Sequence, residues 1–252
     1  MLIALLTDFG LKDGFVGSVK GVIKSINNVD IIDITHEISS FDVLEGALIL
    51  SASYKYFPKY TIFLCVVDPG VGTNRNAIVV RTNNYTFVAP DNGLISLALE
   101  DENIEKIIKI ENRDFFLPSD TNTFHGRDIF APVAAYLSLG IPVESFGTEL
   151  KNIKKIEIPE PINYSNYIEG QIIKFDKFGN AITNLKTLPS AFKKASVANT
   201  PIKGVINSFL EGEKGKLYLI KGSFGFYEIV SPLESAKDKF NLKIGDKIYI
   251  EK

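Results

Sequence analysis

Residues 61–75 read TIFLCVVDPGVGTNR. An uninterrupted apolar run ends in Asp68, a Pro-Gly pair turns the chain at once, and Arg75 follows within one loop. A short apolar run bounded by such a turn is typical of a strand buried on both faces of a parallel sheet. Asp-Pro-Gly can be a plain turn, because proline pre-sets φ and glycine accepts positive φ. Open α/β sheets bind ligands at the carboxyl ends of their strands, however, so Asp68 is also a candidate site residue.

The segment before this strand alternates between strand and helix patterns. LIALLTD (2–8) and VDIIDIT (29–35) predict short buried strands. Apolar residues at helical spacing predict a helix over 15–26 between them, and Asp13 is its expected N-cap.

Further elements complete the first half of the chain. In order they are a helix opened by a capping box at Asp42 and Glu45, the strand at 61–68, a hairpin over 77–90, a short helix from about Gly93, a strand at 104–110 and a helix through 129–137. Strands that alternate with helices indicate an α/β domain with a largely parallel central sheet.

The second half of the chain has a different pattern. From residue 170 onward short strands are separated by Gly, Asn and Asp, which indicates a small barrel or sandwich. The stretch before it contains two prolines and no helical period, as is typical of a linker. We therefore expect an α/β domain over 1–158, a linker over 159–169 and a smaller all-β barrel domain over 170–252.

The composition limits the partners and the location. The 252 residues carry a net charge of −2 without a long lysine run, which gives no electrostatic footprint for nucleic acid. The N-terminal apolar stretch is far too short to span a bilayer and lacks a signal-peptide pattern, so no membrane insertion or export is expected. Cys65 is the lone cysteine, which excludes internal disulfides and a cysteine-based zinc site and favours a reducing cytoplasm.

A second acid is expected at the same edge of the sheet as Asp68. TDFG at 7–10 matches the magnesium-binding signature of protein kinases, but the glycine-rich loop, strand lysine and HRD motif of kinases are missing. As a strand end, TDFG places Asp8 beside Asp68, and Asp13 follows at a helix start. Either acid alone is most simply a strand end or a helix cap. Two strand-end acids on one edge favour a site.

His125 offers a base for this site. It stands in NTFHGRD, directly before an apolar helix, where a lone histidine is usually structural or solvated. Beside Asp68 and Arg75, however, it would complete a set of one acid, one base and one cation with a rigid donor fork.

The other histidine and the neighbouring arginine have simpler interpretations. His36, in DITHEIS, is more readily a structural residue than a wall of the site, and Arg127 is expected to bridge to Asp128 or Asp120. Two histidines without metal-ligand spacing predict no catalytic metal.

Two loops of the second half combine small, polar and aromatic residues. FDKFGNAITNL contains Asp176, Phe178 and Asn180 around one turn, and KGSFGFYEIV contains Ser223. Each loop alone is most simply a β-turn. The functional interpretation is that Asp176 and Asn180 bind a polar ligand while Phe178 stacks on a flat base, which suits a nucleoside site formed between domains.

Five stretches in order along the chain resemble one family. They are LLTDFGLKDGFVGSVKGVI (5–23), VVDPGVGT (66–73), APDNGL (89–94), TFHGRDIFAPVAAYL (123–137) and FDKFGNAITNL (175–185). Together they are similar to the S-adenosylmethionine (SAM) hydrolase, or SAM hydroxide adenosyltransferase, family, which is related to SAM-dependent chlorinases and fluorinases. The resemblance implies hydrolysis of SAM to adenosine and L-methionine, with SAM as the substrate and no cofactor.

The resemblance also implies an assembly and a set of site residues. It implies a homotrimer whose sites lie between the α/β domain of one subunit and the barrel of its neighbour. The implied catalytic residues are Asp68, Arg75 and His125. The implied substrate-binding residues are Asp8 for the ribose, Asp13 and Ser223 for methionine, and Asp176, Phe178 and Asn180 for the nucleoside.

Two alternatives stay open at this point. The chain could be a halide-using SAM adenosyltransferase, although halide enzymes of this kind replace the acid at position 68, so Asp68 favours the hydrolase branch. From a different class, it could be a SAM or adenosine sensor without turnover.

Overall fold

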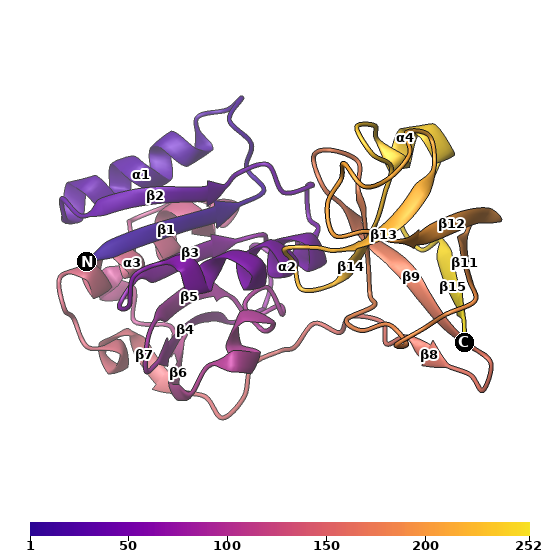
Figure 1. Ribbon diagram of the computed structural model, residues 1–252. Coiled ribbons are helices and arrows are strands. Elements are labelled where there is room, and N and C mark those ends of the chain that lie inside the picture. Colours follow the sequence, from indigo (N-terminus) through magenta and orange to yellow (C-terminus); the bar gives the residue numbers. More distant parts are fainter. The chain divides into compact units, whose positions relative to one another are not determined.

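The computed structural model describes residues 1–252, which form two compact units, Met1–Ile156 and Glu157–Lys252 (Figure 1). None of the helices combines the length and apolar character that crossing a bilayer requires.

The first unit is a seven-stranded sheet with helices packed on it (Figure 1). Its strands are β1 (Leu2–Thr7), β2 (Asp30–Thr35), β3 (Ile62–Val66), β4 (Ala77–Thr82), β5 (Thr86–Pro90), β6 (Ile104–Ile110) and β7 (Gly147–Glu149). The order across the sheet is β2-β1-β3-β5-β4-β6-β7; β2, β1, β3 and β5 pair in parallel, and the remaining pairings are antiparallel. The predicted α/β unit with a largely parallel sheet is confirmed.

The helices of this unit cover both faces of the sheet. They are α1 (Phe15–Ile26), α2 (Val43–Ser53) and α3 (Ala131–Ser138), with 3-10 turns η1 (Tyr54–Tyr56), η2 (Ala98–Asp101), η3 (Arg113–Phe115) and η5 (Val143–Phe146), and a π-helical turn η4 (Gly126–Phe130). Leu5 and Leu64 pack with α1 and α3 on one face, while Ala4 and Phe63 pack with α2 on the other. Since successive side chains of a strand alternate between faces, a strand covered on both sides is apolar throughout, as 62–67 is.

Three local predictions for this unit were wrong. β2 is an edge strand that pairs only with β1, so it is largely exposed rather than buried, with 47% of Ile32 accessible. Asp13 is not the N-cap of α1; Gly14 holds that position, and no side chain caps it. The region after Gly93 forms turns and the short η2 instead of a regular helix.

The capping box before α2 is only half formed. Asp42 accepts a hydrogen bond from the backbone N–H of Glu45 at 2.9 Å. The Glu45 carboxylate accepts from the N–H of Ser39 at 2.8 Å. The acid at the N-cap was therefore predicted correctly, and its partner stabilises the preceding turn.

The second unit is a closed β-barrel with one short helix. Its elements are β8 (Ile162–Asn163), β9 (Tyr167–Phe175), β10 (Ala181–Thr183), β11 (Lys194–Val197), β12 (Thr200–Val205), β13 (Leu217–Lys221), β14 (Tyr227–Val230), α4 (Ala236–Phe240) and β15 (Lys247–Glu251). The sheet order is β10-β14-β13-β12-β11-β15-β9-β8, and β10 also pairs with β9, which closes the ring around an apolar interior. The predicted all-β barrel is confirmed. The stretch 159–169, expected as a linker, contains β8 and the start of β9.

Candidate active site

Two acids follow neighbouring parallel strands at one edge of the first sheet. β1 ends at Thr7 and β3 at Val66, and these two residues are register partners. Asp8 and Asp68 therefore lie at the same edge, as predicted, and both line a pocket of about 300 Å³. The residues around it are Asp8, Phe9, Phe15, Ser40, Phe41, Val66, Asp68, Val71, Thr123, Phe124, His125 and Gly126.

Asp68 forms a buried ion pair with Arg75. Arg75 Nε donates to Asp68 Oδ1 at 3.0 Å and to Oδ2 at 2.9 Å, and Nη2 donates to Oδ2. Only 7% of the arginine side chain and 6% of the aspartate side chain are exposed. A buried ion pair is stable only with good geometry, because both charges lose their hydration. This pair holds the guanidinium in one orientation.

The loop between these residues is folded tightly on itself. The backbone N–H of Val71 donates to the carbonyl of Asp68, and Thr73 Oγ1 donates to the carbonyl of Gly70 at 2.7 Å. Gly72 has a φ of 76°, and a Cβ there would lie 2.9 Å from the carbonyl oxygen of Asn122. Glycine therefore lets the loop approach the segment that precedes His125.

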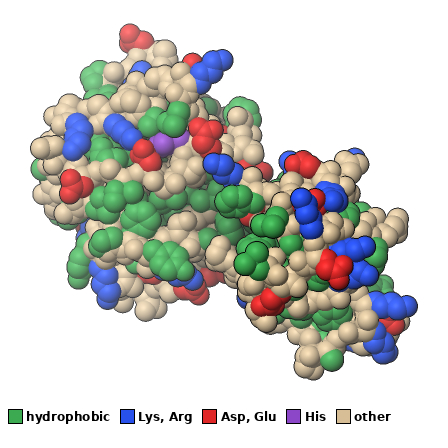
Figure 2. Space-filling model, turned by 45° about the horizontal axis from the view of Figure 1, so that its top comes forward, with side chains coloured by type: hydrophobic (Ala, Val, Ile, Leu, Met, Phe, Trp, Pro, Cys, Tyr) green, Lys and Arg blue, Asp and Glu red, His purple; other side chains and the backbone are tan.

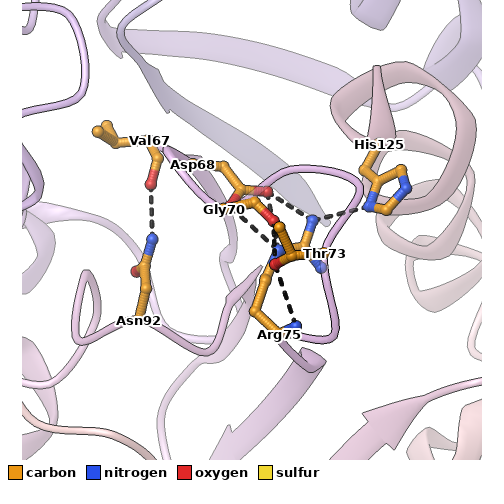
Figure 3. Close-up of polar contacts among 7 residues, drawn as sticks. All are labelled: Val67, Asp68, Gly70, Thr73, Arg75, Asn92 and His125. Atoms are coloured by element: carbon orange, nitrogen blue, oxygen red, sulfur yellow. Dashed lines mark hydrogen bonds and ion pairs between the residues drawn. The ribbon is translucent and has the colours of Figure 1, made fainter. Parts of the chain in front are cut away.

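His125 completes a chain of three side chains (Figure 3). Its Nδ1 lies 2.8 Å from Arg75 Nη2. Arginine has donors only, so Nδ1 accepts and the proton of the neutral ring is on Nε2, which lies on the side of the ring away from Arg75 (Figure 3). Burial lowers the pKa of His125 below its ordinary 6.5 and the positive charge of Arg75 lowers it further, while Asp68 and Asp128 oppose the shift. The arrangement holds a neutral imidazole.

An aromatic wall lines the pocket together with Asp68 and His125. The rings of Phe9, Phe15 and Phe124 contact one another edge to face, with centroids 5.2 to 6.2 Å apart. Gly126 allows the wall to form, because a Cβ there would lie 2.9 Å from Phe9 Cζ and 3.2 Å from Phe124 Cε2. Phe41, which also lines the pocket, has 69% of its surface exposed. Figure 2 shows that apolar side chains reach the surface of the molecule among charged ones.

These phenylalanines were not identified from the sequence. Phe41 has a positive φ of 69° in the turn before α2. No periodicity marks such a position, although the acidic cap one residue later locates the turn. Phe9 and Phe124 stand next to residues that were identified, Asp8 and His125.

Asp8 and Asp13 differ in their surroundings. Asp8 Oδ2 accepts from the backbone N–H of Phe41 at 2.9 Å, which leaves Oδ1 available at the pocket. Asp13 is exposed and is not among the residues that line the pocket.

Arg127 is not part of the hydrogen-bonded set Asp68, Arg75 and His125; its partner is Asp128. Its Nε donates to Asp128 Oδ1 at 2.6 Å, so the predicted bridge to Asp128 is confirmed.

In the second unit, the acid of FDKFGN is used by its own turn. Asp176 Oδ1 accepts from the N–H groups of Phe178 and Asn180, at 2.9 and 2.8 Å, and Oδ2 accepts from Asn180 Nδ2 at 2.8 Å. Asn180 is buried, while 74% of Phe178 is exposed. The turn therefore presents a phenylalanine ring rather than a carboxylate.

Ser223 lies in the turn between β13 and β14. β10 and β14 are antiparallel, with Ala181 opposite Ile229. The turn before β10 is therefore next to the end of β14, whereas the loop with Ser223 precedes the start of β14. The two loops share a neighbour in Glu228 of β14, because a Cβ at Gly222, next to Ser223, would overlap the Glu228 carboxylate, and the charge of Asp176 acts on that carboxylate.

The chain is similar to a known family over most of its length. The model of the SAM hydroxide adenosyltransferase N-terminal domain matches residues 3–147, and that of the C-terminal domain matches residues 170–249. An (R)-S-adenosyl-L-methionine hydrolase from Methanocaldococcus jannaschii is 34% identical, over 99% of this chain and 95% of the relative. A fluorinase from Actinopolyspora mzabensis is 23% identical, over 99% and 96%. Among solved structures, an uncharacterized conserved protein from Thermotoga maritima has a TM-score of 0.89 and 38% identity, over 99% of this chain and 100% of that one.

Proposed function

The chain belongs to the SAM hydroxide adenosyltransferase family, and we propose that it is an enzyme that hydrolyses SAM to adenosine and L-methionine. The observation that carries the proposal for this chain's own residues is Arg75, which contacts both Asp68 and His125 beside the pocket.

The reaction needs help at the nucleophile rather than at the leaving group. The sulfonium makes C5′ electrophilic, and the C5′–S bond breaks with its electron pair going to sulfur, so methionine leaves as a neutral thioether. Free water has a pKa of about 15.7, which makes hydroxide scarce at neutral pH. The site must therefore aim a water at C5′ and accept its proton as the new C–O bond forms.

We propose that Asp68 accepts this proton. Its carboxylate receives three contacts from Arg75, but each oxygen has more than one lone-pair direction. His125 is less suited, because Nδ1 is occupied by Arg75 and Nε2 carries the proton. In this account His125 fixes the guanidinium, and Arg75 orients Asp68 and stabilises the developing hydroxide.

The proposed substrate contacts come from both units. Asp8 Oδ1 accepts from a ribose hydroxyl, and the aromatic wall keeps water away from the reacting charges. Phe178 stacks on the base, which its exposure favours. Asn180 supports that turn and contacts the nucleoside, as proposed from the resemblance.

The methionine part needs partners for its charged ends. The resemblance implies Asp13 and Ser223 near methionine, and Asp176 is a second candidate for the ammonium. Both oxygens of Asp176 already accept hydrogen bonds, so exposed Asp13 is the better partner.

The proposed assembly is a homotrimer in which the barrel of one subunit contributes to the pocket of its neighbour. This assembly is what the resemblance implies, and the exposed Phe178 is free to reach such a neighbouring pocket. The cytoplasmic location stays a prediction.

Product analysis tests the function. The purified protein is incubated with SAM, with and without chloride and with and without excess chelator, and the products are identified by mass spectrometry. We expect adenosine and L-methionine in every arm. Formation of 5′-chloro-5′-deoxyadenosine would instead indicate the halide reaction, loss of activity with chelator would indicate a metal, and tight SAM binding without products would indicate a sensor.

A further inference from the structure

His36 is buried and has no part in the mechanism above. Only 5% of its surface is exposed, and it follows β2, the edge strand of the sheet. Its hydrogen bonds lead from the surface of the first unit to the end of β1, where Asp8 stands.

On its inner side, His36 holds the TDFG turn at two points. Its Nδ1 lies 2.8 Å from Thr7 Oγ1. Its backbone carbonyl accepts from the N–H of Gly10, also at 2.8 Å. Thr7 Oγ1 in turn accepts from the N–H of Phe9 at 3.2 Å. These contacts bracket Asp8 in the chain, and they fix the backbone on both sides of it.

On its outer side, His36 faces an ion pair. Its Nε2 lies 3.1 Å from Asp33 Oδ1, although the N–H direction is not that of a well-aligned hydrogen bond. Asp33 Oδ2 accepts from Lys20 Nζ of α1 at 2.6 Å. Burial opposes the charge of Asp33, but contacts with Lys20 and His36 hold its pKa below the ordinary 3.8.

This arrangement selects one tautomer of His36. The Asp33 carboxylate can only accept, which favours the ring proton on Nε2, so the Thr7 hydroxyl donates to Nδ1 while its oxygen accepts from Phe9. The ring proton is then on Nε2, facing the Asp33 carboxylate. In this form His36 Nδ1 and Thr7 Oγ1 are both hydrogen-bonded and the Nε2 proton faces a negative charge, which favours a single orientation of the turn.

We propose that His36 is a positioning residue that acts on substrate binding through Thr7: it fixes the turn that carries Asp8, so that the free Asp8 oxygen meets a ribose hydroxyl. Asp8 has one further restraint, the N–H of Phe41 on Oδ2. The proposal rests on the ribose-binding role proposed for Asp8. It predicts that the contribution of His36 disappears when the ribose hydroxyl is removed, which a purely structural histidine would not show.

The test measures binding of adenosine, 2′-deoxyadenosine and 3′-deoxyadenosine by calorimetry, together with KM and kcat for SAM. The variants are His36→Phe, which keeps a ring without hydrogen bonds, and Thr7→Val, which keeps the shape without the hydroxyl; Thr7→Ser is the conservative variant. We expect Phe and Val to weaken adenosine binding and raise KM about tenfold, the effect of one lost interaction of moderate strength. Binding of one of the two deoxynucleosides stays unchanged, kcat changes much less than KM, and Ser restores the wild-type values.

The matched control is Ser138→Ala. Ser138 is also buried, and its Oγ accepts from Asn27 Nδ2 at 2.9 Å, which joins the end of α1 to α3 far from Asp8 in the chain. This variant should lower the melting temperature without changing the preference for adenosine over its deoxy forms. If His36→Phe does not fold, Thr7→Val and Thr7→Ser decide.

Two outcomes have different meanings. Equal losses for adenosine and both deoxynucleosides, or a Thr7→Val variant that binds like the wild type, would overturn the positioning role. Absence of SAM hydrolysis in the wild type, with the expected adenosine discrimination still present, would overturn the proposed function and leave the role of His36 in place.

Discussion

Asp68 and Asp176 have the same local sequence setting and opposite surroundings. Each follows a strand and is followed by a glycine within a tight turn. Asp68 pairs with a side chain seven residues away, and that side chain contacts His125, a further fifty residues along. Asp176 is satisfied by the N–H groups of Phe178 and Asn180 in its own turn.

The difference separates an acid that serves a site from an acid that serves a turn. A carboxylate with local backbone partners stabilises the conformation that produces those partners. A buried carboxylate held by an arginine from another part of the loop costs desolvation and gains a fixed charge, which is useful where charge changes during a reaction. The largest effects on turnover are therefore expected at Asp68 and Arg75, and the smallest at Asp176.

Substitution of the Asp68–Arg75 pair should have the largest effect. Asp68→Asn removes the proposed proton acceptor, and Arg75→Lys removes the fork that holds both neighbours, so kcat should fall by about 10²- to 10⁴-fold in each. Asp176→Asn should leave kcat unchanged. Adenosine binding and melting temperature serve as controls, because loss of a buried partner also destabilises the fold by about 3–5 kcal/mol. Similar kcat values for the three variants would remove the distinction between the two acids.

Two substitutions of His125 separate the accepting role of Nδ1 from a role of the ring in proton transfer. Asn places an amide oxygen near the position of Nδ1 and can still accept from Arg75, whereas Ala cannot. We expect His125→Ala to lower kcat about a hundredfold and His125→Asn to retain most of the activity, since fixing the guanidinium is the role assigned to the ring. The measurement is single-turnover kinetics. If Asn and Ala were equally impaired, the ring itself would take part in proton transfer.

The pH profile tests the neutral state of His125. Protonation of Nδ1 would place a second N–H donor against the N–H donor of Arg75, and the hydrogen bond between them would be lost. The active form of His125 is therefore the neutral one. Because burial and Arg75 lower the pKa of His125, the site loses activity only as pH falls below the ordinary value of 6.5 and keeps it above that value. The measurement is kcat/KM against pH. A loss that begins above 6.5 and is absent in His125→Asn would contradict the assignment.

In the barrel turn, substitution of the acid should affect stability, and substitution of the ring should affect nucleoside binding. Asp176→Ala removes an acceptor for three donors and should destabilise the barrel by about 1 to 3 kcal/mol. Phe178→Ala should instead weaken nucleoside binding with little loss of stability, because the ring is 74% exposed. Denaturant unfolding and adenosine calorimetry distinguish the two. Weakened binding in Asp176→Ala at unchanged stability would assign the acid to the ligand.

Substitution of Glu228 should have the smallest effect of all, and the effect should be on the pH dependence of stability and not on turnover. Burial raises the pKa of this β14 carboxyl to about 7, and the negative charge of Asp176 adds to the shift. An acid whose folded pKa is raised binds more protons in the folded state, so stability is lost as pH rises from 4.5 through about 7. Glu228→Gln should remove this dependence. Hydrogen exchange of β10 and β14 below and above this range measures it, and an unchanged slope in the variant would contradict the shift.

Most of the fold could be predicted because its signals are local or periodic. The apolar run at 62–67 and the alternation of strands and helices indicated the parallel sheet. The position of β2 at the sheet edge could not be predicted, because Ile31 and Ile32 give the same pattern whether or not a neighbour covers them. The short β8 and β11 depend on pairing with β9 and β15, which no local pattern specifies.

The same limit applies to the site. That Asp8 and Asp68 would share an edge followed from parallel pairing of β1 and β3. The contact between Arg75 and His125 spans fifty residues; their residue types grouped them as a cation and a base, and the resemblance implied a shared site, but no local pattern specified the contact. Whether Asp176 faces a ligand or its own turn depended on hydrogen-bond geometry that the residue types leave open.

The oxygen of the adenosine 5′ hydroxyl should come from a water that this site delivers to C5′ of SAM. The direct measurement is a single turnover of the purified protein with SAM in water enriched in oxygen-18, with mass spectrometry of both products. We predict that the label appears in the 5′ hydroxyl of adenosine, that methionine is unlabelled, and that Asp68→Asn slows the appearance of label by the same factor as kcat. Unlabelled adenosine, or label in an amino-acid product formed with methylthioadenosine, would contradict the account.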